Sequence, residues 1–241
     1  MQIVGKTDVG AVRESNQDTF YYDTLSESVY FAIVCDGMGG ANAGNVASEC
    51  AVRSISDYIK RSYKDGMSSM QIENILRSAI VTANSTVYEM SRKDENLFGM
   101  GTTVVLLFVS GNTGYVLHIG DSRMYIYTAD NFNQITVDHS IVQNMIDSGK
   151  ITPDEAKEHP SKNIITRALG VNEEVKADMD FVTLNKDDIV LLCSDGLTNF
   201  VTDEEIVEII KCFDETVAAR LIDKANRSGG GDNVTAVAVK I

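Results

Sequence analysis

One stretch, YFAIVCDGMGG from Tyr30 to Gly40, constrains the fold more than any other. Its apolar run is rich in aromatic and β-branched side chains, which predicts a buried strand. Asp36 therefore lies where a core strand reaches the surface. The three glycines that follow, Gly37, Gly39 and Gly40, permit main-chain angles and close approaches that other residues resist. An Asp-Gly step after a strand is most often only a turn, so this stretch alone does not define a site.

Three further carboxylates occupy similar positions along the chain. Asp121 follows VLHIG, Asp195 follows IVLLCS, and Asp232 comes just before a strand that begins at Val234. If these strand ends lie together, the carboxylates converge with Asp36, and close like charges require protonation or a cation. Carboxylate and carbonyl oxygens favour magnesium, manganese or calcium over zinc or copper. The sequence therefore predicts a divalent metal site.

Strands and capped helices alternate along the chain, with no linker, repeat or low-complexity tract. Apolar residues at helical spacing predict a first helix after the glycines, with Asn42 or Asn45 as its cap, and a second from about Ser69 to Lys93. Ser68 with Gln71, Thr152 with Glu155, and Thr202 with Glu205 form plausible capping boxes. Gly149 and Gly229 are expected to close the helices that precede them.

The β-rich runs follow the second helix. Gly101 to Val109, Gly114 to Gly120 and Arg123 to Thr128 are joined by short turns, which predicts an antiparallel meander. Further strands are expected at Asp188 to Gly196 and from Asn233 to the last residue. We therefore expect residues 1–241 to form one domain.

Composition limits the classes of function. The 241 residues carry a formal net charge of −14, which disfavours binding to nucleic acid or an anionic membrane. No apolar run approaches the roughly 18 residues of a membrane span, and no targeting segment is recognised. Four cysteines without CxxC spacing, Cys35, Cys50, Cys193 and Cys212, are expected to be small core residues. We expect a cytoplasmic protein.

The remaining chemistry-bearing residues give weaker signals. His118 alternates within a strand, which favours a packed ring over a catalytic one, while His139 and His159 lie in an irregular segment that could border a site. Arg13, in RESNQD, precedes Asp18 by five residues. A guanidinium fits a pair of phosphate oxygens, although a lone arginine in a polar loop is usually solvated or salt-bridged.

Eight ordered stretches resemble the metal-dependent serine/threonine protein phosphatases of type 2C, in their short bacterial form. They are RESNQD, VCDGMGG, GMGTT, GDSRMY, DHSIVQNMIDSGKIT, HPSKNIITRALG, LLCSDGLTN and GGGDNVTAV, and they span essentially the whole chain. The resemblance implies an α+β fold, a four-layer α-β-β-α sandwich of two antiparallel sheets flanked by helices. It also implies a metal centre at one end of the sandwich.

The family's pattern, carried over to matching residues, implies a role for each. Asp36 would bridge two metals, with the Gly37 carbonyl on one of them, and Asp195 and Asp232 would complete the pair. Asp18 would act mainly through metal-bound water, and Asp121 would hold a third metal with Asp195. Arg13 would bind the substrate phosphate. Two or three manganese or magnesium ions are thus the expected cofactors, and a metal-activated water would attack phosphorus without a phosphoenzyme.

The resemblance has further implications and two departures. A segment at about 140–166 would form a flap beside the site. The substrates would be phosphoproteins, those of a cognate serine/threonine kinase, and we expect a monomer that binds no nucleic acid and does not insert into membranes. Met38 replaces a histidine proposed elsewhere in the family as proton donor to the leaving alcohol, so a metal-bound water is the expected donor. Ala41 replaces a histidine frequent in bacterial relatives, and we expect activity to persist.

Two alternatives belong to other classes of function. A catalytically silent relative could bind phosphoproteins, but it would be expected to lose metal carboxylates, and all five are present. A two-metal nuclease would use similar carboxylates, but the acidic charge and the lack of a basic stripe disfavour it. Phosphopeptide hydrolysis with manganese, with and without a chelator, separates the three.

Overall fold

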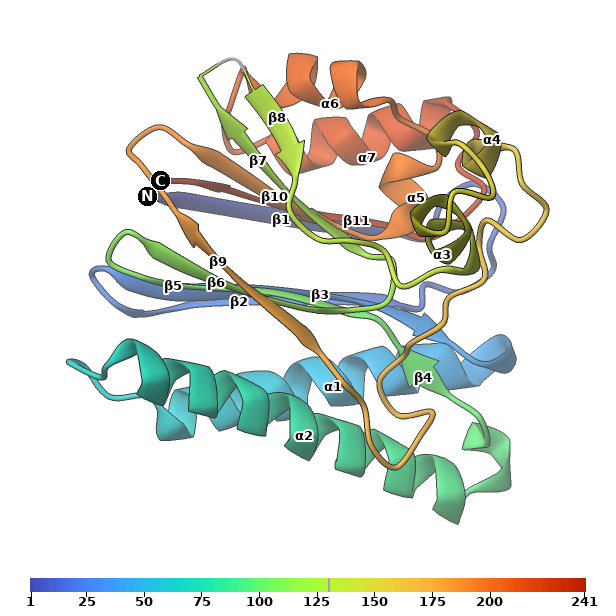
Figure 1. Cartoon of the computed structure of the whole chain (residues 1–241), viewed down its shortest axis with the longest axis horizontal. Helices are drawn as coiled ribbons and strands as arrows, with labels where there is room; N and C mark the ends of the chain where they lie inside the picture. Colours follow the sequence, from blue (N-terminus) through green and yellow to red (C-terminus); the bar gives the residue numbers. More distant parts are fainter. Residues whose placement is uncertain (130) are drawn as a thin grey trace.

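Two antiparallel sheets lie face to face, and helices cover the outer face of each (Figure 1). The computed structural model describes residues 1–129 and 131–241, and only the main chain of residues 40–42. The four-layer sandwich implied by the sequence is confirmed. The first sheet has the strand order β1-β11-β10-β7-β8, and the second has β2-β3-β5-β6-β9 with β4 paired to β3.

The strands are β1 (Gln2–Asp8), β2 (Asp18–Ser26), β3 (Val29–Met38), β4 (Gly101–Thr102), β5 (Val104–Ser110), β6 (Thr113–Ile119), β7 (Arg123–Thr128), β8 (Asn131–Gln134), β9 (Asp178–Thr183), β10 (Ile189–Cys193) and β11 (Val234–Lys240). The helices are α1 (Gly40–Ser62), α2 (Ser69–Lys93), the 3-10 turn η1 (Glu95–Leu97), α3 (Ile141–Asp147), α4 (Pro153–Lys157), α5 (Asp195–Thr198), α6 (Asp203–Ile210) and α7 (Val217–Arg227). Among the described residues, no helix has the length and apolarity that a membrane span requires.

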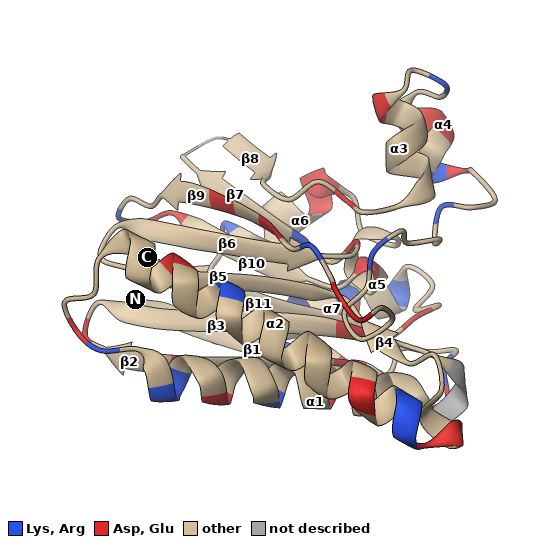
Figure 2. Ribbon diagram, turned by 60° about the horizontal axis from the view of Figure 1, so that its bottom comes forward, with Lys and Arg blue, Asp and Glu red and all other residues tan. Residues whose placement is uncertain are grey.

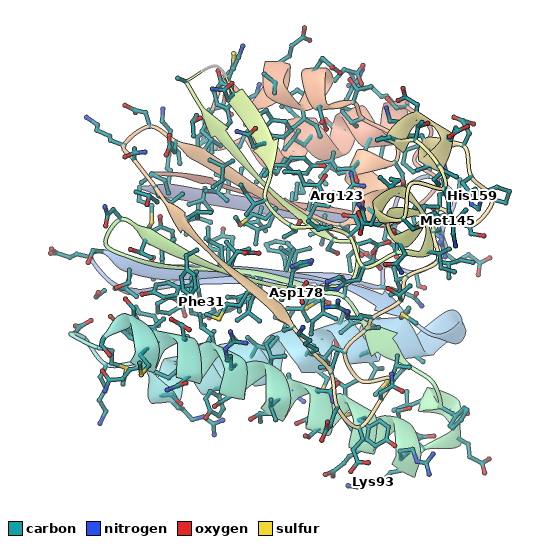
Figure 3. The ribbon with its side chains drawn as sticks, viewed as in Figure 1. Phe31, Lys93, Arg123, Met145, His159 and Asp178 are labelled. Carbon is teal, nitrogen blue, oxygen red and sulfur yellow. The ribbon has the colours of Figure 1, made fainter. Side chains whose placement is uncertain are left out.

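Strand β3 is apolar from Val29 to Cys35 because both of its faces are buried there. Tyr30, Ala32 and Val34 face the core between the two sheets. Phe31 and Ile33 point the other way, into the core between this sheet and helices α1 and α2; Figure 3 shows Phe31 on that side. Alternate residues of a strand face opposite sides, so a strand between two cores needs no polar face. A third core lies between the first sheet and helices α5, α6 and α7.

Helix ends follow the predicted caps with one exception. Ser68, Thr152 and Thr202 each form the predicted capping box, and each such cap contributes about 1 kcal/mol to helix stability. Helix α1 begins at Gly40, so the prediction of Asn42 or Asn45 as its cap is wrong. The helix starts earlier because Gly39, at φ 122°, turns the chain directly out of β3. The side chain of Ala41 lies outside those described.

The predicted meander is also wrong in one strand. Residues 114–119 form β6 beside β5, but residues 123–128 form β7 in the other sheet, between β10 and β8. Gly120, at φ +103°, begins the turn by which the chain crosses between the sheets. Met124 and Ile126 then cover the inter-sheet core from the opposite side. Burial of both sheets' inner faces therefore outweighs local pairing of consecutive strands.

Other differences concern polar or exposed elements. Strands β1, β2, β8 and β9 were not predicted, and the run from Gly101 to Val109 is divided at Thr103 into β4 and β5. Cys35, Cys50 and Cys193 are buried as predicted, whereas Cys212 is exposed just after α6, so the prediction of a core residue there is wrong. Residues 140–166, which include α3 and α4, project from the sandwich (Figure 2).

Candidate active site

Four of the predicted aspartates line one pocket of about 980 Å³. Asp36 lies near the end of β3, Asp121 follows β6, Asp195 opens α5 directly after β10, and Asp232 precedes β11. Because these strand ends meet at one end of the sandwich, residues separated by up to about 200 positions in the chain come together. Arg13, Gly37 and Met38 line the same pocket.

Asp18, the fifth aspartate, lies beside the pocket on strand β2. It is paired with Asp36 in the β2–β3 ladder, and only 6% of its surface is exposed. Its Oδ2 atom accepts a hydrogen bond of 2.7 Å from the Ser194 hydroxyl. Its Oδ1 atom is buried without a hydrogen-bond partner among the described residues.

Burial and mutual repulsion oppose ionisation of these carboxyl groups. Burial, followed by the charges of neighbouring aspartates, raises the pKa of Asp36 well above its usual range. Burial likewise raises the pKa of Asp18 to about 7 and that of Asp121 to about 8, and it raises the pKa of Asp195. Such a cluster is unfavourable at neutral pH unless cations neutralise it.

The donor set fits divalent cations. The unpaired Oδ1 atoms of Asp18 and Asp195 are both buried, and such an atom costs free energy unless something binds it. Carboxylate and carbonyl oxygens are the hard ligands that manganese and magnesium prefer. The aspartates at four strand ends, with Gly37 beside them, therefore form a pocket suited to such ions.

Two threonines that we did not single out from the sequence hold Asp36 in place. The Thr102 hydroxyl donates to the Asp36 carbonyl at 2.8 Å, and the Thr103 hydroxyl accepts the Asp36 N–H at 2.9 Å. Thr103 also donates its own N–H to the Asp36 carbonyl and shares a 2.7 Å hydrogen bond with the Ser122 hydroxyl. Their only signal in the sequence is the GMGTT stretch.

Close packing and main-chain conformation explain why glycines follow Asp36. A Cβ atom on Gly37 would lie 2.0 Å from the Gly44 carbonyl oxygen, so the N-terminal part of α1 packs directly on the main chain there. The Gly37 N–H also donates to the Gln17 carbonyl at 3.0 Å. Gly39 adopts a positive φ that other residues rarely accept. The sequence DGMGG therefore lets a strand, a helix and the Arg13 loop meet at the pocket.

Arg13 reaches the pocket from a loop between β1 and β2. Its Nη2 atom lies 2.9 Å from Asp232 Oδ2, and 52% of its side chain is exposed. Asn233 anchors this loop because its side chain donates to the Val9 and Ser15 carbonyls and accepts the Gln17 N–H. The guanidinium is thus accessible at the pocket mouth, where an anion could bind it.

The histidines lie outside this pocket. His118 is buried as predicted, and its ring stacks on His139 with centroids 4.4 Å apart. His159 lies in the 140–166 segment, where its Nδ1 atom accepts the Ser161 N–H. Neither His139 nor His159 lines the aspartate pocket.

A second candidate metal cluster fails on hydrogen bonding. Potential ligand atoms of His118, His139 and Asp178 lie within 4.8 Å of one another. However, His139 Nδ1 accepts the Gly120 N–H, which places the ring proton on Nε2, facing Asp178. A metal bound to Nε2 would require the ring proton to move to Nδ1. There it would face the Gly120 N–H, which is also a donor. The aspartate pocket is therefore the better metal site.

Comparison with known proteins gives the same family that the sequence resembles. A family model for protein phosphatase 2C matches residues 11–227. The serine/threonine phosphatase stp of Listeria innocua is 38% identical over 238 residues, which cover 98% of this chain and 94% of that protein. The crystal structure of the Mycobacterium tuberculosis serine/threonine phosphatase PstP/Ppp aligns with a TM-score of 0.90 at 34% identity, covering 100% of this chain and 98% of the other.

A further solved structure contains metal. The catalytic domain of the serine threonine protein phosphatase PstP, in complex with two manganese ions, aligns with a TM-score of 0.85 at 33% identity, covering 99% of this chain and 97% of the other. The chain belongs to the protein phosphatase 2C family. It is a serine/threonine protein phosphatase, and its substrates are phosphoproteins.

Proposed function

We propose that this phosphatase hydrolyses phosphoserine and phosphothreonine by direct attack of water at a centre of two divalent ions, manganese or magnesium. The observation that carries the proposal is the convergence of four strand-end aspartates on one pocket, with buried oxygens of Asp18 and Asp195 left unpaired. Asp36, Asp195 and Asp232, with the Gly37 carbonyl, hold the two ions. Asp18 supports them from the adjacent strand. Asp121 joins Asp195 in holding a third ion.

The chain's own groups account for the other steps. Bound divalent ions supply a lowered water pKa and positive charge beside the phosphoryl oxygens. Arg13 binds the substrate phosphate through its fork of N–H donors, exchanging its contact with Asp232 for the incoming anion. Met38 lines the pocket but has no proton to donate, so the leaving alcohol takes its proton from water.

The same proposal covers the surroundings of the site. Residues 1–241 act as one catalytic domain, and residues 140–166 form a flap that contacts the peptide beyond its phosphate. Asn163, Ile164 and Ile165 of this segment line the pocket, which supports that role. We infer a cytoplasmic monomer that opposes a serine/threonine kinase. Lys and Arg alternate with Asp and Glu along α1 and α2, so these helices offer no basic stripe for nucleic acid (Figure 2).

The test is release of phosphate from a phosphothreonine peptide after dialysis against chelator, with manganese then restored. We expect no turnover in chelator and full turnover with manganese. Tight peptide binding without hydrolysis in manganese would instead indicate a silent binding module. Cleavage of DNA or RNA with an intact phosphopeptide would indicate a nuclease.

A further inference from the structure

His139 holds both main-chain polar groups of Gly120, the residue before Asp121. The Gly120 N–H donates to His139 Nδ1 at 3.1 Å, and the His139 N–H donates to the Gly120 carbonyl at 2.8 Å. That carbonyl belongs to the peptide unit that joins Gly120 to Asp121. Gly120 itself has φ +103°, and a Cβ there would lie 2.6 Å from Thr103 Cγ2. The orientation of the Asp121 carboxylate therefore depends on this contact.

The orientation of the His139 ring is fixed from its other side. With Nδ1 accepting, Nε2 carries the proton and donates to Asp178 Oδ2 at 3.1 Å. Asp178 Oδ1 in turn accepts a 2.7 Å hydrogen bond from Arg167. Burial lowers the pKa of His139 despite the Asp178 contact, so the neutral ring is the form present at neutral pH.

The same residue anchors both ends of the 140–166 flap. His139 directly precedes the flap, and its carbonyl accepts the Thr166 N–H at 2.7 Å. Arg167, just beyond the flap, is ion-paired to Asp178. Asp138, just before His139, receives hydrogen bonds from Arg123 through both carboxylate oxygens, at 2.9 and 2.7 Å. Arg123 begins β7 and Asp178 begins β9, so strands of different sheets supply the two side chains (both labelled in Figure 3).

We propose that His139 is a positioning residue that orients Asp121 for its cation and couples that site to the base of the flap. It acts through Gly120 and has no contact with the substrate. The inference rests on the proposed function because it assigns Asp121 to a bound cation. Hydrogen bonds that orient metal ligands in this way typically change metal affinity or activity by about 10- to 100-fold when lost.

Two substitutions separate the contacts of the ring. His139→Asn places a carbonyl oxygen near the position of Nδ1, so it can still accept the Gly120 N–H. His139→Gln places an amide nitrogen near Nε2, so it keeps the Asp178 contact and loses the acceptor. Calorimetric titration with manganese should show that the Gln variant binds the weakest ion roughly 10-fold less tightly, while the Asn variant stays close to the parent.

Asn84→Ser is the matched control. Asn84 is buried, and its Oδ1 accepts the Gly170 N–H at 2.8 Å, so its loss also removes a side-chain clamp on a glycine. This variant should unfold at a lower temperature but bind manganese as the parent does. A second check is the double variant of His139→Gln with Asp121→Asn. Its loss of affinity should equal that of Asp121→Asn alone, because both changes act on one carboxylate.

Equal manganese binding by the parent and both His139 variants would overturn the inference, as would additive losses in the double variant. If His139→Gln does not fold, His139→Leu takes its place, since leucine fills the buried site and also removes the acceptor of the Gly120 N–H. Unchanged manganese binding in that variant would also overturn the inference. Phosphopeptide hydrolysis by the parent is measured alongside, so that failure of the proposed function is seen separately.

Discussion

Arg13 is the residue whose contact in the structure differs most from its proposed role. Its guanidinium lies 2.9 Å from Asp232, yet we assign it to the substrate phosphate. An ion pair this exposed contributes little to stability, so giving it up for a dianionic phosphate costs little. The sequence identified this residue through its resemblance alone, because its partner is 219 positions away.

Arg13→Ala should therefore weaken substrate binding more than catalysis. A charge-assisted contact of this kind contributes roughly 1.5 to 3 kcal/mol, so KM should rise about 10- to 150-fold. Arg13→Lys should recover part of the loss, because lysine keeps the charge but not the fork. Steady-state kinetics on a phosphothreonine peptide test this, with Arg92→Ala on α2 as the control. Unchanged KM and kcat in Arg13→Ala would make Arg13 a surface residue only.

Asp36 allows a test that needs no substrate. Its pKa is raised in the folded protein, so its contribution to stability is present below its unfolded pKa and is lost as pH rises through the folded value. Burial also raises the pKa of Asp18 to about 7 and that of Asp121 to about 8, so these two carboxyl groups add a loss of the same sign up to near pH 8. The metal-free protein thus carries a repulsion that grows with pH.

Asp36→Asn should relieve that repulsion. In chelator, the unfolding temperature of the variant should rise relative to the parent, and by more at pH 8 than at pH 5. With manganese present the order should reverse, because the parent gains the ions and the variant does not. Glu89→Gln, an exposed change on α2, should show neither effect. A difference between Asp36→Asn and the parent that is equal at both pH values would contradict a repulsive cluster.

At the scale of elements, local signals predicted helix ends and core strands but not sheet membership. Ser68, Thr152 and Thr202 cap their helices through contacts three residues away, which a sequence displays directly. Strand β7 joins the other sheet because the inner faces of both sheets must be covered. The residues next to β7 in the chain do not indicate which sheet it joins. Strand β9 escaped prediction because it is a short edge strand whose sequence, DMDFVT, carries two aspartates, and aspartate is depleted in strands.

The candidate site likewise contains residues that the sequence indicates and residues that only the fold reveals. Asp36, Asp121, Asp195 and Asp232 stand out because each carboxylate follows or precedes an apolar strand. Thr102, Thr103, Ser194 and Asn233 do not, because they act through main-chain contacts or buried partners 66 to 224 positions away. Such supports depend on the packed fold, which local patterns do not determine.

The flap gives a prediction at this scale. Ile164 lines the pocket and is 49% exposed, so it can contact a peptide without holding a metal. Ile164→Ser should raise KM for a phosphopeptide several-fold and leave hydrolysis of a small aryl phosphate unchanged. Val81→Ser is the control, because it makes the same kind of exposed apolar-to-polar change on α2, away from the pocket. Equal losses on both substrates would show that the flap supports the metal centre instead.

At the scale of the whole molecule, the two sheets act as a frame that brings distant aspartates to one end. Three cores, one between the sheets and one beneath each helical layer, fix the relative positions of β3, β6, β10 and β11. Packed interiors resist small displacements, so the strand ends keep their spacing despite mutual repulsion. The fold thus holds an arrangement of charges that is unfavourable until cations bind.

Hydrolysis by this protein should depend on divalent ions bound in the aspartate pocket. The most direct test measures bound manganese by calorimetry and phosphate release from a phosphothreonine peptide, in the parent, Asp36→Ala and Asp121→Ala. We expect the parent to bind at least two ions, Asp36→Ala to lose both binding and turnover, and Asp121→Ala to keep a two-ion core. Turnover of Asp36→Ala above a few per cent of the parent rate, or full parent turnover without bound metal, would contradict the account.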